Sequence, residues 1–141
     1  MSARPMGAVA RAGDTLETPS QSDLLAAAAD KRWSVETGGF FDGAGRHIAT
    51  DRDSQTKLLA EMVAIGAGLR ADPSGWKLMG NGFVMLTNAE MQGVIAAARD
   101  HVTNAFAREA LMQAEIASGL VTTLGHVEDP TSAGLTPWPS N

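Results

Sequence analysis

The chain contains no cysteine among its 141 residues. This absence excludes a disulfide framework, a zinc–thiolate site and a cysteine nucleophile. No uninterrupted apolar run approaches the ~20 residues that are needed to cross a bilayer. The first thirteen residues, MSARPMGAVARAG, also lack the continuous apolar stretch of a signal peptide. We therefore expect no membrane-spanning segment, no membrane partner and no secretory leader.

Positive charge is scarce and scattered along the chain. Lysine and arginine together number 11 against 16 acidic residues, which gives a formal net charge of −5. The arginines occur singly, and acidic residues flank several of them. Because phosphate backbones are bound by clustered positive charge, this pattern predicts a solvated surface and no nucleic-acid partner.

Length and composition favour a single domain with tails. A chain of this length buries roughly two-thirds of its unfolded surface, which suffices for one core without disulfides or metals. Glycine, proline and small polar residues concentrate at both ends, and such residues interrupt regular elements. The sequence thus predicts a small α+β domain over residues 23–118. An extended N-terminal arm over residues 1–22 and an extended C-terminal tail over residues 119–141 are expected to flank it.

Three helices are expected inside the domain. Each has a residue before it that can accept hydrogen bonds from the free N–H groups of the first turn. The clearest signal is Thr87 with Glu90, which has the spacing of a capping box. The predicted ranges are 23–37, capped by Ser22 or Asp23; 50–69, capped by Thr50 or Asp51; and 88–118. The last would be on the order of 45 Å long, so we expect its far end to project or to pack on another chain.

Two β-hairpins are expected between these helices. Residues 40–49 place short apolar runs around Asp42-Gly43-Ala44-Gly45, and residues 76–86 place them around Gly80-Asn81-Gly82. Glycine, asparagine and aspartate adopt the positive φ angles that tight hairpin turns need. The fold class is therefore α+β, with about three helices and two β-hairpins.

The aromatic residues divide into a core group and one residue in the tail. Four are expected in the core because they bury large apolar areas: Trp33, Trp76, Phe83 and Phe106. Trp138 lies between two prolines in the tail, three residues after Leu135. Tryptophan is enriched at protein interfaces, so Trp138 and Leu135 are candidate partner-binding residues. The alternative is that Trp138 docks onto its own domain.

No motif predicts a metal site or a cofactor. Asp51-Arg52-Asp53 resembles the start of a calcium loop, but Thr56 and Met62 occupy the positions that need glycine and glutamate. Capping of the following helix explains these aspartates better. The glycine-rich turns have no lysine with Ser/Thr at the start of a following helix, so they do not form a phosphate-binding P-loop.

The three histidines predict no catalytic centre. His47, His101 and His126 lack the spacing of a zinc site. His101 is followed two turns later by Glu109, but a general base also needs a nucleophile and an orienting partner. We expect His101 at the surface or at an interface, and we expect a protein that is not an enzyme and binds no cofactor.

The order of motifs from Arg32 to Ile116 carries a family resemblance. It begins with Arg32-Trp33 and Glu36-Thr37-Gly38-Gly39, and its most specific part is the Thr-Asp-Arg-x-Ser-Gln block at residues 50–55. The matching positions that follow are Trp76-Lys77, Gly82-Phe83-Val84, Leu86, His101-Val102, Phe106, Glu109 and Ile116. This region resembles a small domain of unknown function found in bacteriophage and prophage tail-fibre and tail-fibre-assembly proteins.

The resemblance implies a role in a virion or in its assembly. It predicts a non-enzymatic structural component of a phage tail, at the baseplate or the tail-fibre attachment point. The partners would be other phage tail or fibre proteins, and the location would be the virion tail after synthesis in the bacterial host cytoplasm. A homo-oligomer is expected, with a trimer only by analogy to tail fibres. The alternative is a fibre-assembly chaperone that is not retained in the virion.

Overall fold

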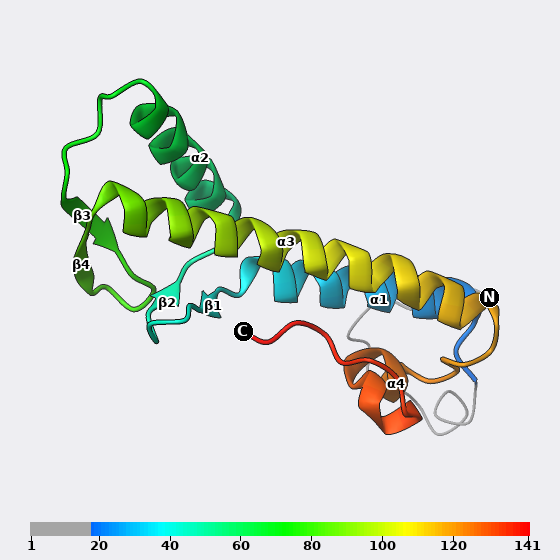
Figure 1. The fold of residues 1–141 in the computed structure, drawn as a ribbon. Helices are drawn as coiled ribbons and strands as arrows, with labels where there is room; N and C mark the ends of the chain where they lie inside the picture. Colours follow the sequence, from blue (N-terminus) through cyan, green and yellow to red (C-terminus); the bar gives the residue numbers. More distant parts are fainter. Residues whose placement is uncertain (1–17) are drawn as a thin grey trace.

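The computed structural model describes residues 18–141 and confirms the α+β class, with three long helices and two antiparallel hairpins (Figure 1). Most of the expected N-terminal arm, residues 1–17, lies outside the described residues. The elements in chain order are α1 Gln21–Thr37, β1 Phe40–Phe41, β2 His47–Ile48, α2 Arg52–Gly66, β3 Ser74–Lys77, β4 Phe83–Leu86, α3 Asn88–Ala117, α4 Leu124–Glu128 and the 3₁₀ helix η2 Pro130–Ala133.

Side-chain caps define where the helices begin. The Thr87 hydroxyl accepts a hydrogen bond from the Glu90 N–H at 3.1 Å, and the Glu90 carboxylate accepts one from the Thr87 N–H at 2.9 Å. Ser20 and Asp23 form the same capping box, so α1 begins two residues earlier than the predicted start at residue 23. Asp51 caps α2, as the sequence predicts. These caps pair N–H groups that a helix leaves unsatisfied in its first turn.

The two hairpins are short and lie next to each other in space. In the first, Phe40 pairs with Ile48, and the Asp42 carboxylate accepts hydrogen bonds from the N–H groups of Ala44 and Arg46. In the second, the pairing runs from Ser74 opposite Leu86 to Lys77 opposite Phe83. The Met79 N–H donates to the His47 carbonyl at 3.0 Å, which joins the two hairpins.

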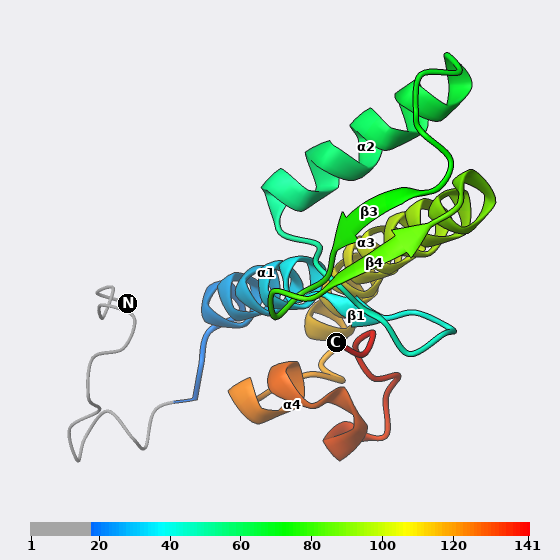
Figure 2. The same ribbon diagram turned by 90° about the vertical axis from the view of Figure 1, so that its left-hand side faces the viewer.

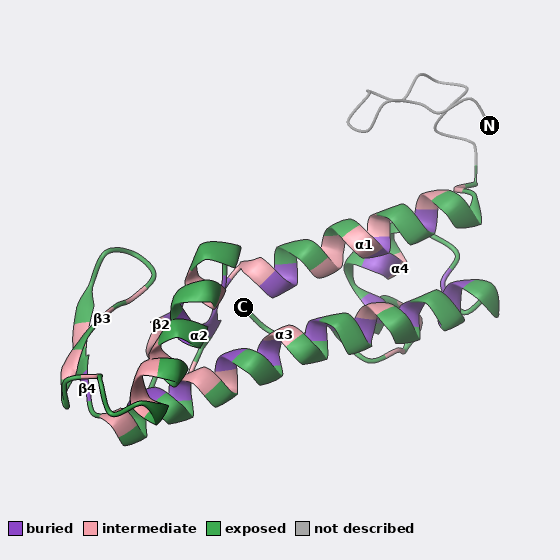
Figure 3. Cartoon of the chain, turned by 90° about the horizontal axis from the view of Figure 1, so that it is seen from above, coloured by how far each residue is buried: buried purple, intermediate pink, exposed green. Residues whose placement is uncertain are grey.

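Helix α3 runs through the molecule and contributes to two hydrophobic cores (Figures 1 and 3). The first half of α3 packs with the hairpins and α2; this core contains Phe40, Ile48, Leu58, Leu86, Met91, Val94 and Ala98. The second half packs with α1 and the C-terminal segment; this core contains Leu24, Ala28, Val35, Ala105, Met112, Ile116, Val121, Val127 and Trp138. The α2 ribbon is coloured mainly as exposed or intermediate, so α2 is the least covered of the long helices (Figure 3).

The prediction of an extended tail over residues 119–141 is wrong. This segment forms α4 and η2 and then returns along α1 and α3 toward β1 (Figures 1 and 2). The Asn141 side-chain amide donates to the carbonyls of Val35 and Gly39 at 2.8 and 2.7 Å. The segment buries Val121 and Val127 against the far end of α3. That end is therefore covered by the same chain and does not project freely.

Three of the four aromatic residues expected in the core are exposed. Trp33 is 49%, Phe106 45% and Phe83 71% exposed. Trp76 is half-buried and packs against the first core, so the expected core position is confirmed only for part of its side chain. The sequence shows that a residue is apolar, but it does not show which apolar side chains are covered by other parts of the chain. Phe40, which entered the prediction only as a hairpin residue, belongs to the core.

Candidate functional site: the Glu36 cluster and the α2–α3 groove

The end of α1 and the start of α2 meet in a buried ionic cluster around Glu36. We call Arg32, Glu36, Thr50, Arg52 and Gln55 the Glu36 cluster. The Glu36 carboxylate accepts hydrogen bonds from Arg32 Nη1 at 2.7 Å, from Arg52 Nε at 2.7 Å and Nη2 at 3.1 Å, and from Gln55 Nε2 at 2.9 Å. Glu36 is 1% exposed. A buried charge of this kind persists only when paired and hydrogen-bonded, which this one is on both oxygens.

Two opposing effects act on the pKa of Glu36. Burial alone raises the pKa, because it disfavours the charged carboxylate. Hydrogen bonds from Arg52, Gln55 and Arg32 outweigh burial, so the pKa lies below its ordinary value. The carboxylate is therefore ionised at neutral pH and holds α1 and α2 together.

Thr50 completes the cluster through the backbone. Its hydroxyl donates to the Glu36 carbonyl at 2.7 Å and accepts from the Gly39 N–H at 2.9 Å. Gly39 has a φ of 80°, and a Cβ atom there would lie 2.8 Å from the Ile48 carbonyl oxygen. Only glycine fits this turn, because other residues are strained at that φ and too large for the space.

Replacing Thr50 with valine is expected to lower the free energy of unfolding by about 2–3 kcal/mol. Valine keeps the shape but leaves the Gly39 N–H and the Glu36 carbonyl unpaired in a buried place. Thr56→Val is the matched control, since the Thr56 hydroxyl is exposed and bonds only within α2. Urea unfolding measures both variants. A Thr50→Val loss no larger than that of the control would contradict the role given to this hydroxyl.

The Thr-Asp-Arg-x-Ser-Gln block is thus mainly structural. Thr50, Arg52 and Gln55 belong to the cluster, while Asp51 caps α2 and accepts hydrogen bonds from Ser54. The Asp51 pKa is lowered chiefly by the hydrogen bond from the Ser54 hydroxyl. The prediction that these aspartates cap a helix is confirmed for Asp51.

Two exposed aromatic rings border the cluster, and an arginine guanidinium lies over each ring. The Arg52 guanidinium lies 4.7 Å from the centre of the Trp33 ring, and that of Arg32 lies 4.4 Å from the centre of the Phe106 ring. Arg32 also donates to Glu109 at 2.9 Å. Tryptophan and arginine are the residues most enriched at energetically important positions of protein interfaces.

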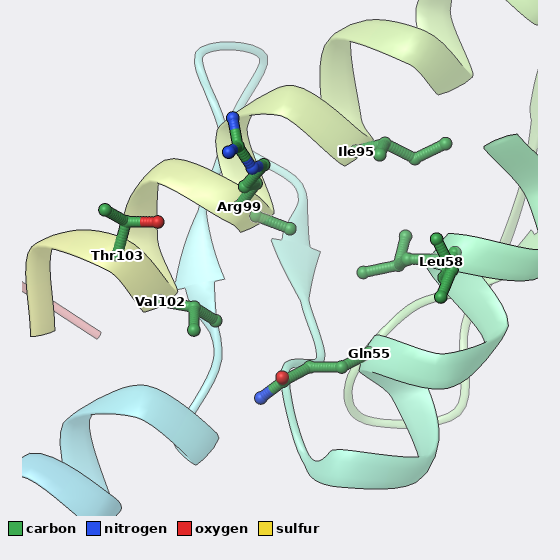
Figure 4. A pocket seen from close by; sticks show the side chains of 8 residues that line it. Gln55, Leu58, Ile95, Arg99, Val102 and Thr103 are labelled. Atoms are coloured by element: carbon green, nitrogen blue, oxygen red, sulfur yellow. The ribbon is translucent and has the colours of Figure 1, made fainter. Parts of the chain in front are cut away.

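An apolar groove of about 230 Å³ opens between α2 and α3 beside this cluster. Leu58 extends from α2 toward α3 and Ile95 extends from α3 toward α2, while Arg99 rises from α3 at the rim (Figure 4). The lining residues, which we call the α2–α3 groove, are Gln55, Leu58, Leu59, Ile95, Ala98, Arg99, Val102 and Thr103. Apart from Arg99, no lining residue carries a charge.

The structure does not place the predicted partner-binding residues at this surface. Trp138 is 8% exposed, and its Nε1 donates to the Val127 carbonyl at 2.8 Å. Leu135 packs half-buried against the same core. The alternative reading, in which Trp138 docks onto its own domain, is the one that the structure supports. An anchor for a partner's pocket would have to be exposed, and Trp138 is not.

No sequence motif marks the groove residues as a binding site, although Gln55 and Val102 are among the positions that carry the family resemblance. The sequence of α2 does contain a signal for an exposed apolar surface. The helix has more apolar positions than one narrow face can bury: Leu58, Leu59, Met62, Val63 and Ile65. Only Leu58 is fully buried in α2. An apolar surplus of this kind indicates either a deeply buried helix or a helix with a second apolar contact.

His101 is buried, which corrects the expectation of a surface or interface histidine. Its Nε2 lies 2.7 Å from the Val35 carbonyl, and its ring stacks on Phe40 at 5.3 Å between centres. His101 thus connects the two cores.

Over residues 18–141 no group of three His, Asp or Glu side chains is arranged to hold a metal ion. Within the same range, no helix combines the length and the apolarity that crossing a bilayer requires.

Comparison with protein families assigns the chain to a family of unknown function. Residues 19–131 match the family described as domain of unknown function DUF4376, and the chain belongs to that family. The match spans all three long helices and both hairpins, and it reaches into η2. Comparison with curated proteins and with solved structures finds no match.

Proposed function

We propose that this protein is a non-enzymatic structural component of a bacteriophage tail, at the baseplate or the tail-fibre attachment point. It acts through protein–protein contacts with other tail or fibre proteins. Its location in this proposal is the virion tail, after synthesis in the host cytoplasm. Self-assembly into a homo-oligomer, a trimer by analogy to tail fibres, is part of the proposal.

The observation that carries the proposal is the exposed apolar surface beside the Glu36 cluster. The α2–α3 groove and the Trp33 and Phe106 rings form a surface of the composition found in protein interfaces. The hydrogen bonds of the Glu36 cluster beside it hold α1 to α2, as a rigid binding body requires. The motif resemblance to tail-fibre-associated domains supports the phage setting.

The composition of purified phage particles tests this proposal. Mass spectrometry is expected to find the protein in the particles at a fixed ratio to other tail proteins. Leu59→Asp, in the groove, is expected to reduce incorporation strongly. Leu120→Asp is the matched control, because Leu120 is similarly exposed but lies outside the groove. Equal incorporation of both variants would contradict the role of the groove.

A fibre-assembly chaperone is the second candidate. An open apolar groove also suits the transient binding of an unfinished fibre protein. In that case the protein would be absent from finished particles, but particles made without it would lack fibres. Absence from the particles with no effect on fibres would overturn both candidates. An enzymatic activity of the purified chain would contradict the non-enzymatic role.

A further inference from the structure

Helix α2 displays a second apolar stripe that no other part of the described chain covers. Leu59, Met62, Val63 and Gly66 are spaced by three and four residues, so they lie along one side of the helix. Leu59 and Val63 are each 64% exposed. A helix that buries one face against its own core and exposes a second apolar stripe has the pattern of a helix with two packing partners.

Helix α3 presents a matching stripe on the other wall of the groove. Ile95, Val102 and Phe106 are spaced by seven and four residues, which puts them on one side of α3. Ile95 and Val102 line the groove with Leu59, and Phe106 follows Val102 by about one turn of α3, outside the lining residues. Of the α2 stripe, Leu59 lines the groove, and the rest of the stripe continues along α2 from it. An apolar groove between two helices with an exposed apolar stripe beside it suits a third helix, the arrangement of helix-in-groove recognition.

The charge at the α2–α3 groove distinguishes between the molecules that could bind there. Arg99 is exposed at the groove rim and forms no ion pair with any described residue. No acidic residue lines the groove. A two-fold dimer that buried the groove against itself would bring two surfaces of the same sign together. A helix that carries a carboxylate would instead pair with Arg99.

We propose that the α2–α3 groove binds an amphipathic helix of another protein, with apolar residues on one face and an acidic residue that pairs with Arg99. This inference rests on the protein-binding role proposed for the groove, but not on the phage-tail setting. The apolar stripes of α2 and α3 provide the contact area, and Arg99 determines the orientation and the choice of partner.

Selection from a displayed library of helical peptides about 18 residues long tests this inference, since such a helix spans about 27 Å. The full chain serves as the target. Enriched peptides are expected to carry apolar residues at i, i+3 or i+4 and i+7, with aspartate or glutamate at the edge of that face. For the best peptide, Arg99→Glu is expected to weaken binding at least about tenfold. Exchanging the peptide's acidic residue for lysine should restore it.

Two controls separate the groove from the rest of the surface. Lys77→Glu makes the same change of sign on β3 and is expected to leave the affinity unchanged, as is Leu120→Asp. Leu59→Asp is expected to abolish binding while the circular dichroism spectrum stays that of the wild type. No enrichment, enriched peptides without an acidic preference, or unchanged binding to Leu59→Asp would each overturn the inference. So would a dimer of the free chain that Leu59→Asp dissociates.

These outcomes are independent of the particle experiment. A chain that binds acidic helices through the groove but has no part in phage particles or fibres refutes only the proposed setting. A chain that is present in particles but fails the peptide selection refutes only the inference about the groove.

Discussion

Replacing Trp138 with alanine is expected to lower the free energy of unfolding by about 3–5 kcal/mol, as for other buried tryptophans. The ring belongs to the core formed by α1, α3 and the C-terminal segment. Its Nε1 pairs with the Val127 carbonyl, and the Arg108 guanidinium lies 5.8 Å from the ring centre. The truncation therefore leaves a cavity and an unpaired carbonyl. Urea unfolding followed by circular dichroism measures the loss.

Trp33→Ala is the matched control for this experiment. Trp33 is half-exposed, and the Arg52 guanidinium lies 4.7 Å from the centre of its ring. Its loss is expected to cost about 1 kcal/mol, the scale of an exposed cation–π contact. If Trp138→Ala proves no more destabilising than Trp33→Ala, the C-terminal segment does not belong to the core in solution.

Removal of residues 120–141 checks the same conclusion on a larger scale. An extended tail, which the sequence predicts over residues 119–141, could be deleted without unfolding the domain. In the structure, deletion uncovers the second half of α3 and removes Val121, Val127 and Trp138 from the core. The shortened chain is therefore expected to lose cooperative unfolding. A shortened chain of wild-type stability would contradict this packing and restore the prediction of an extended tail.

Replacing Glu36 with glutamine is expected to lower the free energy of unfolding by about 1.5–3 kcal/mol at neutral pH, the scale of lost hydrogen bonds to a charged group. Glutamine has nearly the same shape but leaves Arg32 and Arg52 without their shared buried counter-charge. The cost stays below that of breaking a fully buried ion pair, because Arg32 keeps its ion pair with Glu109 and the Arg52 side chain is 53% exposed. Glu128→Gln is the control, since the Glu128 ion pair with Lys31 is exposed and is worth below about 1 kcal/mol.

The Glu36→Gln effect is expected to depend on pH. The folded-state pKa of Glu36 is lowered, so its stabilisation is fully present above the unfolded-state pKa of about 4.3. It is lost as the pH falls through the folded-state pKa. The difference between wild type and Glu36→Gln should stay constant between neutral pH and about pH 5 and shrink below about pH 4. A difference that does not change in this range would show that the charge of Glu36 contributes little.

The predictions from the sequence succeeded where the signal is local. Thr87 with Glu90 forms the predicted capping box, and Asp51, one of two candidates, caps α2, because a cap involves residues only three positions apart. The glycine-rich turn after Phe41 also folds as expected, since Asp42 binds N–H groups within four residues of itself. Helices and hairpins are therefore encoded within short stretches of this chain.

The candidate site was not predictable in the same way. Glu36 bonds to residues 16 and 19 positions away, and the α2–α3 groove joins two helices that are separated by a hairpin. The proline- and glycine-rich composition of residues 119–141 indicated a tail. The segment is instead held by contacts such as that between Asn141 and Val35, which are 106 positions apart.

The sequence by itself thus determined the class of fold and the caps that begin α2 and α3, and its charge and composition argued against nucleic-acid binding and a thiolate site. Only the tertiary structure decided which apolar residues are buried, because burial depends on contacts between distant parts of the chain. That decision moved Trp138 from a candidate binding residue into the core. It also left Leu59, Val63, Trp33 and Phe106 at the surface, and the proposed binding function depends on these residues.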